Sequence, residues 1–213
     1  MYLENPKKFG MLVEQAHQVA LNVLRPISRK YDKAEHAYPK ELDMLASLLD
    51  GMNEGAPGSA GATSATGGSS NSNSGEVKNG SNMSTALGIM EMCWGDVGLL
   101  LAMPRQGLGN AAIAAVANDE QLERFKGTWA AMAITEPNCG SDSAAIRTTA
   151  VKDGDDYILN GEKIYVTSGA RADSVVVWAT LDKNIGRAAI KSFVVKHGTP
   201  GMEIARLEKK LGI

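Results

Sequence analysis

The chain has 213 residues, of which 44% are hydrophobic and 22% are charged, and its formal net charge is −2. This is the composition of a globular protein with room for one sizeable domain or two small ones. Lys and Arg form no concentrated block, so neither nucleic acid nor an anionic membrane surface is an expected partner.

The two cysteines and the apolar runs narrow the class further. Cys93 and Cys139 lie far apart with no CxxC or CxxH spacing, which argues against a disulfide framework or a metal site and favours the cytoplasm. No stretch approaches the roughly 20 consecutive apolar residues of a membrane span. The N-terminal residues carry charges where a signal peptide needs an apolar region, so we expect no membrane association.

The first stretch, residues 5–50, has a helical pattern. Apolar residues from Phe9 to Ile27 recur at spacings of three and four, and Pro26 is expected to kink or shorten that helix. A second helix is expected to begin near Pro39 and to continue through a run of leucines up to Leu49.

Residues 51–82 differ in kind, because Gly, Ser and Asn dominate and almost no large apolar side chain occurs. Such a segment cannot offset its ordering entropy, so a mobile loop or linker is expected. A substrate-gating loop is the alternative, and a passive linker fits the composition better. Helical composition returns at Ser84, and Asn118 with Asp119 predicts the start of a short last helix.

From Trp129 the apolar period changes to two, which is typical of strands. The strand-like runs are 130–135, 146–152, 156–161, 163–169, 174–180, 190–196 and 202–207. Asp153-Gly154 and Asn160-Gly161 lie between such runs and favour hairpins. We therefore predict an α+β protein with two domains: a helical domain at 1–128 with its flexible insertion, then an antiparallel β barrel or sandwich at 129–213.

One motif is a decoy. Residues 107–112 match GxGxxA, the dinucleotide-binding fingerprint, which requires a strand before it and a helix after it. Here a helical pattern broken by Pro104 precedes the motif. A connection between helices, with small residues for close packing, is the better interpretation.

Two segments could carry a ligand site. At 131–143 a strand ends at Thr135 and enters a loop rich in Pro, Asn, Gly, Ser and Asp, which suits a planar ligand with a polar edge or a phosphate. A plain turn needs the same residue types, so the residues alone leave both readings open. At 160–169, alternation places Lys163, Tyr165 and Thr167 on one face, although Tyr and Thr are also common strand residues without any role.

The amino-acid sequences of these segments resemble those of one known protein family. The run MAITEPNCGSDSA at 132–144 resembles the signature of the FAD-dependent acyl-CoA dehydrogenases, and NGEKIYVTSG at 160–169 resembles the hairpin that follows it there. Residues 5–32, 38–42 and 92–125 resemble the helices of that family's N-terminal domain, in the same order. The resemblance covers nearly the whole chain except 51–82.

The resemblance implies FAD as cofactor and assigns residues to it. The positions of Met132, Ile134 and Thr135 line the flavin ring in the family, and that of Thr167 donates to flavin N5. The position of Tyr165 covers one ring face and is usually Trp, so Tyr is a departure that keeps an aromatic plane. The remaining cofactor-binding positions are Gly140 and Ser141, beside the cofactor and the acyl-CoA entrance.

The implied reaction is α,β-dehydrogenation of an acyl-CoA thioester in fatty-acid or related catabolism. In the family a carboxylate removes the α-proton, hydride goes to flavin N5, and electrons pass to electron-transfer flavoprotein; the complete enzymes are homo-oligomers. Ser141, Leu101, Met103 and Pro104 match substrate-binding positions, and no acidic residue closes the acyl pocket there. Helix core is an equally good reading of the last three.

No catalytic residue is assigned. The family's base lies in a C-terminal helical bundle that follows the segment matched by the last residues, so we expect this chain alone to be an inactive fragment of such an enzyme. Two alternatives remain: an acyl-CoA oxidase or flavin-dependent hydroxylase on the same scaffold, and a non-catalytic subunit that binds flavin or acyl-CoA with a partner chain.

Overall fold

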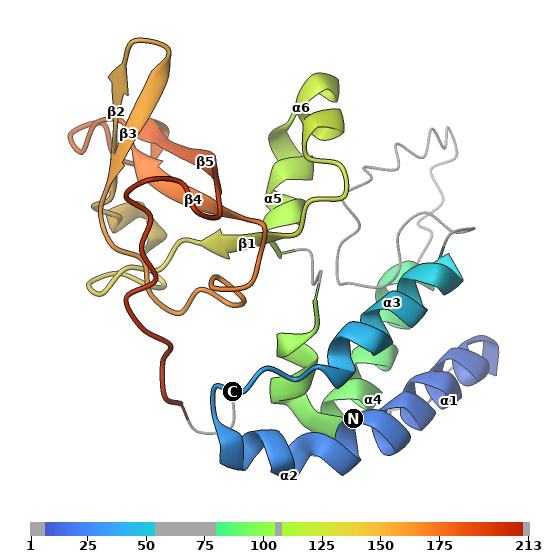
Figure 1. Ribbon diagram of the computed structural model, residues 1–213. Coiled ribbons are helices and arrows are strands. Elements are labelled where there is room, and N and C mark those ends of the chain that lie inside the picture. The colour runs from blue at the N-terminus through green and yellow to red at the C-terminus, as the bar shows by residue number, and fades with distance from the viewer. Residues whose placement is uncertain (1–6, 54–79, 105–107, 211–213) are drawn as a thin grey trace, which may run out of the picture. The chain divides into compact units, whose positions relative to one another are not determined.

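A computed structural model describes residues 7–53, 80–104 and 108–210 of the chain (Figure 1). The described residues divide into two compact units. The helical unit comprises 7–53 and 80–103 together with Lys209 and Lys210, and the mixed unit comprises 104 and 108–208. This agrees with the α+β class, and the two units are described separately below.

The helical unit begins with one long, nearly continuous helix. A short 3-10 turn, η1 (Lys7–Phe9), leads into α1 (Gly10–Val19), a π-helical segment η2 (Ala20–Leu24) and α2 (Arg25–Ala34). Pro26 does not shorten this helix, which continues to Ala34. The turn before it widens instead, and the Arg25 N–H donates to the Ala20 carbonyl five residues back. Widening by one residue is a known way for a helix to accommodate a local disturbance.

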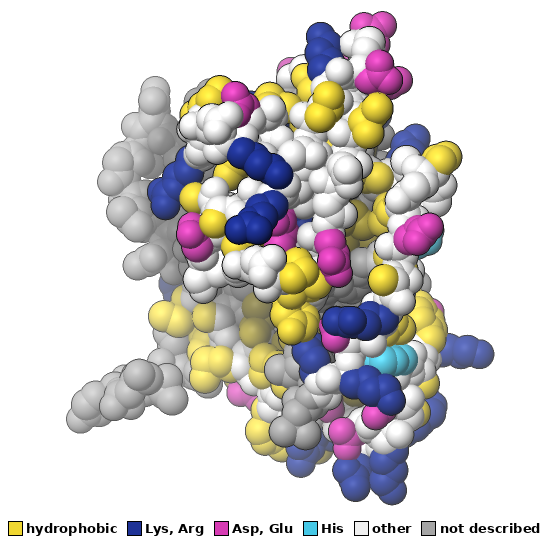
Figure 2. Space-filling model, turned by 90° about the vertical axis from the view of Figure 1, so that its left-hand side faces the viewer, with side chains coloured by type: hydrophobic (Ala, Val, Ile, Leu, Met, Phe, Trp, Pro, Cys, Tyr) yellow, Lys and Arg dark blue, Asp and Glu magenta, His cyan; other side chains and the backbone are white. Residues whose placement is uncertain are grey.

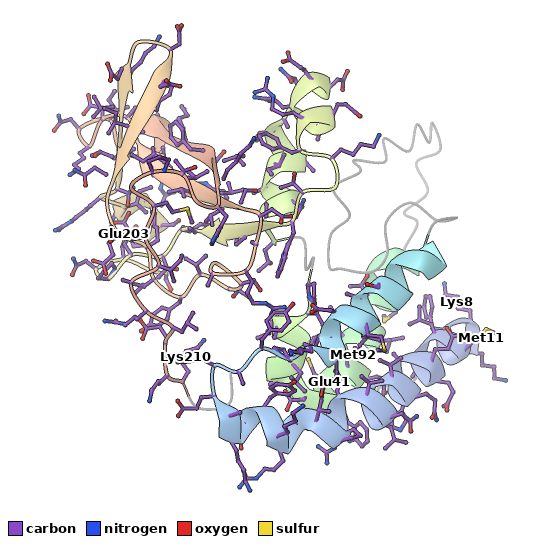
Figure 3. All side chains as sticks on the ribbon, in the orientation of Figure 1. Lys8, Met11, Glu41, Met92, Glu203 and Lys210 are labelled. Carbon is purple, nitrogen blue, oxygen red and sulfur yellow. The ribbon has the colours of Figure 1, made fainter. Side chains whose placement is uncertain are left out.

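Helices α3 (Glu41–Asn53) and α4 (Gly80–Ala102) complete this unit. Both ends of the 51–82 segment are therefore helical, contrary to the prediction of a loop throughout. The choice between a gating loop and a linker concerns residues outside those described. Glu41, at the start of α3, lies beside α2 and accepts hydrogen bonds from Lys30, at 2.7 Å, and from the Tyr31 hydroxyl (Figure 3).

Helix α4 changes direction at Asp96, whose backbone is extended (φ −172°, ψ 119°). The Asp96 carboxylate accepts a hydrogen bond from the Leu99 N–H at 2.8 Å and another from the Ser28 hydroxyl, so it caps the second half of the helix. Next to it, a Cβ on Gly95 would lie 2.8 Å from the Ala20 Cβ. This close approach seats α4 on the π-helical turn, above a core formed by Leu24, Leu42, Leu45, Leu99 and Met103.

By length and composition alone, the stretch Met83–Ala102 of α4 could cross a membrane, which is weak evidence for a membrane span and differs from the expectation of no such stretch. The two acidic residues of this stretch bind other helices, because Glu91 pairs with His17 at 2.8 Å and Asp96 with Ser28. Five exposed apolar residues lie at helical spacing within the two halves of α4, three before the bend at Asp96 and two after it, and we call them the outer stripe of α4: Met83, Met90, Trp94, Val97 and Leu101.

The mixed unit contains one open, five-stranded sheet: β1 (Ala130–Ala133), β2 (Thr149–Asp153), β3 (Asp156–Asn160), β4 (Ser174–Thr180) and β5 (Ile190–Lys196). The order is β1-β4-β2-β3, and β5 pairs with β4. The β2–β3 and β4–β5 pairs are antiparallel, whereas β4 runs parallel to β1 and, through one residue pair, to β2. The sheet is thus mixed rather than wholly antiparallel. The predicted strands 163–169 and 202–207 are irregular.

Helices α5 (Leu108–Val116) and α6 (Asp119–Arg124) belong to this same unit, and α5 packs on β1 and β4 (Figure 1). Gly109, the second glycine of the decoy motif, permits this, since a Cβ there would lie 2.3 Å from the Ala131 carbonyl oxygen. The small residue serves close packing as expected, but against a strand. The domain boundary at 128/129 stays a prediction.

Candidate functional site

The mixed unit contains an open pocket of about 280 Å³ at the end of β1. Nine residues line it: Leu108, Met132, Ile134, Thr135, Gly140, Ser143, Ile164, Tyr165 and Thr167. They come from three separate parts of the sequence, namely the start of α5, the β1 strand with the loop after it, and the irregular segment before β4.

Six of the seven residues predicted to bind a cofactor line this pocket: Met132, Ile134, Thr135, Gly140, Tyr165 and Thr167. The seventh, Ser141, is exposed and follows Gly140 without lining the pocket. Sequence reasoning missed Leu108, Ser143 and Ile164. Ser143 and Ile164 lie inside the two segments already singled out, so their neighbourhood was the available signal.

The three other predicted substrate residues are not among the lining residues of this pocket. Met103 is buried in the core of the helical unit against Leu24 and Leu42, as the packing interpretation expects. Leu101 lies on the outer stripe of α4, and Pro104 is half-buried at the start of the mixed unit's residues.

The first wall of the pocket is a tight turn after β1. The strand ends at Ala133, and Glu136 and Cys139 then exchange two backbone hydrogen bonds, of 2.9 and 3.2 Å. This turn reverses the chain and leaves Ile134 and Thr135 facing the pocket with Gly140 opposite, where an added Cβ would lie 3.8 Å from the Thr135 methyl group.

The second wall, residues 163–169, departs from the strand that its sequence predicts. Tyr165 and Ser168 have left-handed backbones, with φ of 55° and 60°. Such conformations are rare for residues other than glycine and break the alternation of a strand. Ile164, Tyr165 and Thr167 consequently all line the pocket, while Val166 packs into the core beside Ala131 and Ala133.

A buried ion pair joins the two walls. Lys163 Nζ donates to Glu136 Oε1 at 2.8 Å and to the Ile134 carbonyl oxygen at 2.9 Å, and the two charged side chains are only 9% and 6% exposed. The Glu136 carboxylate also accepts from the Thr148 hydroxyl at 2.6 Å and from the backbone N–H groups of Arg147 and Thr148 at 2.6 and 2.9 Å. We call this arrangement the Glu136–Lys163 clamp.

The clamp holds Glu136 in its charged form. Burial alone would raise the pKa of the Glu136 carboxyl, but hydrogen bonds from Lys163, Thr148 and the backbone of Arg147 lower that pKa to about 2. A carboxylate with this many donors stays ionised at neutral pH and is a poor proton acceptor. Glu136 is therefore a structural anion rather than a general base.

The lining combines an apolar floor with separate polar groups. Met132, Ile134, Ile164 and Leu108 provide apolar surface, and the aromatic side chain of Tyr165 stands at the rim. Neither the Thr135 nor the Thr167 hydroxyl has a hydrogen-bond partner among the described residues. Such a set suits a planar ligand that stacks by its faces and is hydrogen-bonded along its edge. Within the described part of the chain, no group of His, Cys, Asp and Glu side chains could hold a metal ion.

Comparison with known proteins identifies the source of this pocket. Residues 131–213 match the family model for the acyl-CoA dehydrogenase middle domain. Residues 131–213 are therefore an acyl-CoA dehydrogenase middle domain. Both walls of the pocket, Ile134–Gly140 and Ile164–Thr167, lie within the matched domain, which confirms the resemblance found in the sequence.

Individual family members extend the likeness. Over 98 residues the chain is 44% identical to cyclohex-1-ene-1-carbonyl-CoA dehydrogenase of Geobacter metallireducens, an alignment that covers 45% of this chain and 26% of that enzyme. Its fold matches butyryl-CoA dehydrogenase of Megasphaera elsdenii at a TM-score of 0.69 and 27% identity, covering 94% of this chain and 51% of that one. Glutaryl-CoA dehydrogenase of Mycobacterium smegmatis in complex with FADH2 matches at 0.73 and 25%, covering 97% and 50%. The chain thus spans about half the length of these solved dehydrogenases.

Proposed function

We propose that this chain supplies the flavin-ring site of an FAD-dependent acyl-CoA dehydrogenase that acts on acyl-CoA thioesters. The observation that carries this proposal is that two separate sequence segments meet at one pocket. Two segments about 30 residues apart were assigned to one cofactor from their sequence, and six of their seven assigned residues line one pocket.

The pocket fits the ring system of a flavin better than a whole dinucleotide. Its volume of about 280 Å³ is at the small end of ligand sites. Its apolar floor, aromatic rim and two free hydroxyl groups match a flat tricycle whose polar atoms lie on one edge. FAD would supply the redox chemistry, accepting two electrons as hydride.

The residues of this chain would orient the ring. Thr135 and Thr167 would hydrogen-bond its polar edge from opposite walls, so that the ring cannot rotate in its plane. Met132 and Ile134 would exclude water from one side, and the Tyr165 side chain would cover part of a face. None of these groups accepts a proton, so the base for the α-proton is not among the residues assigned here.

The substrate class rests on the family and its members. The relatives named above act on the CoA thioesters of different acids. A CoA thioester is therefore the shared chemistry, and the acyl group varies among them. As further proposals, electron-transfer flavoprotein accepts the electrons, the complete enzyme is a homo-oligomer, and the protein works in the cytoplasm.

The test is a visible absorption titration of the purified chain with FAD. We expect a bound-flavin spectrum with resolved vibronic structure, and affinity about fivefold weaker for each hydroxyl removed in Thr135→Val and Thr167→Val. Thr149→Val, in β2 and away from the pocket lining, is the matched control and should leave the affinity unchanged.

Addition of an acyl-CoA under anaerobic conditions then separates binding from turnover. Retained absorbance means that the chain holds flavin without a base, whereas bleaching means that it also supplies the base. Absence of any bound flavin in the wild-type chain, or equal affinity in all three variants, would contradict a flavin site in this pocket.

A further inference from the structure

The two walls of the pocket are tied together at one place. Besides the Glu136–Lys163 ion pair at 2.8 Å, Lys163 Nζ reaches the Ile134 carbonyl at 2.9 Å, and the Ile164 N–H donates to the Thr135 carbonyl at 2.9 Å. Each bond joins a residue of the first wall to one of the second. Of the four linked residues other than Lys163, three line the pocket, and the fourth, Glu136, directly follows Thr135, which also lines it.

The clamp also reaches a third segment, the entry to β2. The Thr148 hydroxyl and N–H and the Arg147 N–H all bind the Glu136 carboxylate. Gly161 makes this approach possible, because a Cβ there would lie 2.4 Å from the Thr148 Oγ1 atom. The carboxylate therefore fixes the turn after β1 against both the chain entering β2 and the chain leaving β3.

A buried ion pair is a costly way to obtain stability alone. Removing two charges from water costs several kcal/mol, and apolar side chains of similar volume often stabilise a fold as well or better. In some proteins such a pair instead fixes the register between the segments that carry it, and here Glu136 and Lys163 bond to groups from three segments at once. The second wall needs this help, because Tyr165 and Ser168 hold unfavourable left-handed conformations and the segment has no sheet partner of its own.

We propose that Glu136 and Lys163 are positioning residues that set the separation of the Thr135 and Thr167 hydroxyls across the pocket. Thr135 precedes Glu136 directly, and Lys163 begins the segment that leads to Thr167. The clamp does not contact the ligand and acts through these neighbours. The consequence for flavin rests on the function proposed above, whereas the consequence for the walls does not.

The experiment compares four forms of the full chain. Lys163→Met removes the cation, and Glu136→Gln with Lys163→Met removes the pair without leaving a buried charge. Val176→Ala, a core residue of the same unit that is 1% exposed and not part of the pocket lining, gives a general loss of stability for comparison. The fourth form is the wild type.

Two readouts are needed. Amide hydrogen exchange of Ile164, whose N–H crosses the walls, is measured against that of Val177 in β4, which reports opening of the sheet. FAD affinity and the flavin absorption spectrum are measured alongside, because a purely structural role would change them no more than the core variant does.

In the double variant we expect the Ile164 exchange rate to rise by about tenfold more than that of Val177, with FAD affinity about tenfold below that of Val176→Ala. Parallel changes at both amides, or wild-type exchange at Ile164 in the double variant, would overturn the proposal. If the wild type binds no FAD, the proposed function fails, but the exchange comparison still decides whether the clamp holds the walls.

Discussion

At the scale of single residues, Glu136 of the turn after β1 is a structural anion, whereas an acidic residue in such a motif invites assignment as a general base. Glu136 lies in a conspicuous motif beside the pocket, which invites a catalytic assignment. Its surroundings exclude that, since Lys163, Thr148 and Arg147 donate to it and lower its pKa to about 2. A carboxyl group held this firmly in the anionic form is a poor proton acceptor at neutral pH and organises the site.

The depressed pKa of Glu136 predicts a specific dependence of stability on pH. Its value is about 2 in the folded chain, against 4.5 for the ordinary group. A pKa that folding lowers contributes stability that is present in full above about pH 4.5 and is lost as the pH falls through about 2. The urea-unfolding free energy of the mixed unit should therefore decline over this interval.

The variant Glu136→Gln isolates this contribution. At pH 6 it should lower the free energy of unfolding by about 3–5 kcal/mol, because Lys163 is left buried without its counter-charge. The deficit should shrink as the pH falls, since the protonated wild-type carboxyl comes to resemble the amide.

Two controls show whether the pH-dependent difference comes from Glu136. Glu123→Gln removes an exposed ion pair with Lys126 in the same unit and should change the unfolding free energy by less than about 1 kcal/mol at every pH. Glu41 also has its pKa lowered to about 2, through Lys30 and Tyr31, so the absolute pH profile contains its titration and only the difference between variants reports Glu136. A deficit of constant size from pH 6 to pH 2 would refute the assignment.

At the scale of secondary-structure elements, local signals succeeded where local physics decides. Asn118 begins α6 as predicted, and its side chain and that of Gln121 cap each other's backbone N–H groups at 2.9 and 3.0 Å. Asp153-Gly154 sits in the β2–β3 hairpin, where Gly154 has a φ of 58°. A cap or a two-residue turn needs only neighbouring residues, so sequence alone can show it.

The wrong structural predictions concern features that depend on contacts between residues distant in the sequence. The run Ile164–Thr167 has high strand propensity, yet it is irregular because bonds from Lys163 and Ile164 to the first wall override that preference. The parallel pairing of β1 with β4 joins residues 44 apart, such as Ala130 and Ser174, and no period in either strand encodes it. The sequence does not predict the Glu136–Lys163 clamp for the same reason, because it joins residues 27 apart, although both lie in the two segments singled out as candidate sites.

Helix α5 supplies a prediction about packing. It begins with Leu108 at the pocket and rests on β1 through Gly109, where a Cβ would lie 2.3 and 2.5 Å from two carbonyl oxygens. Those oxygens belong to backbone, which cannot turn aside as a flexible side chain can. Gly109→Ala should therefore push the helix away from the strand and destabilise the unit by about 1–3 kcal/mol, despite the better helix propensity of Ala.

Thermal unfolding followed by circular dichroism measures this effect. The control is Val116→Ala at the far end of the same helix, where the side chain is 75% exposed and the change should stay within about 0.5 kcal/mol. If Gly109→Ala proved neutral or stabilising, the close contact between α5 and β1 would be wrong. Because Leu108 lines the pocket, the same variant should also weaken FAD binding.

At the scale of the whole molecule, the pocket belongs to one unit and the outer stripe of α4 to the other. Every residue that lines the pocket lies in the mixed unit. In the helical unit, which holds the outer stripe of α4, Met44 adds exposed apolar surface, and so does Met11 on α1 (labelled in Figure 3). The face drawn in Figure 2 carries charges of both signs, because acidic side chains lie among the Lys and Arg side chains. Surface charge of one sign therefore does not keep copies of the chain apart.

The outer stripe of α4 predicts self-association of the isolated chain. Exposed apolar residues that are scattered singly are normal, but three at helical spacing before the bend of α4 and two after it concentrate exposed apolar surface on one helix, of the kind that other molecules cover. At micromolar concentration the wild-type chain should elute from size-exclusion chromatography as species larger than a monomer.

The double variant Met90→Lys with Val97→Lys should shift the elution toward the monomer, because the two added like charges on α4 repel a second copy. Val116→Lys places a charge on a still more exposed apolar residue, in α5 and outside the stripe, and should leave the elution unchanged. A monodisperse wild-type monomer would contradict the prediction, and an equal response to both substitutions would mean that net charge, rather than the stripe, controls association.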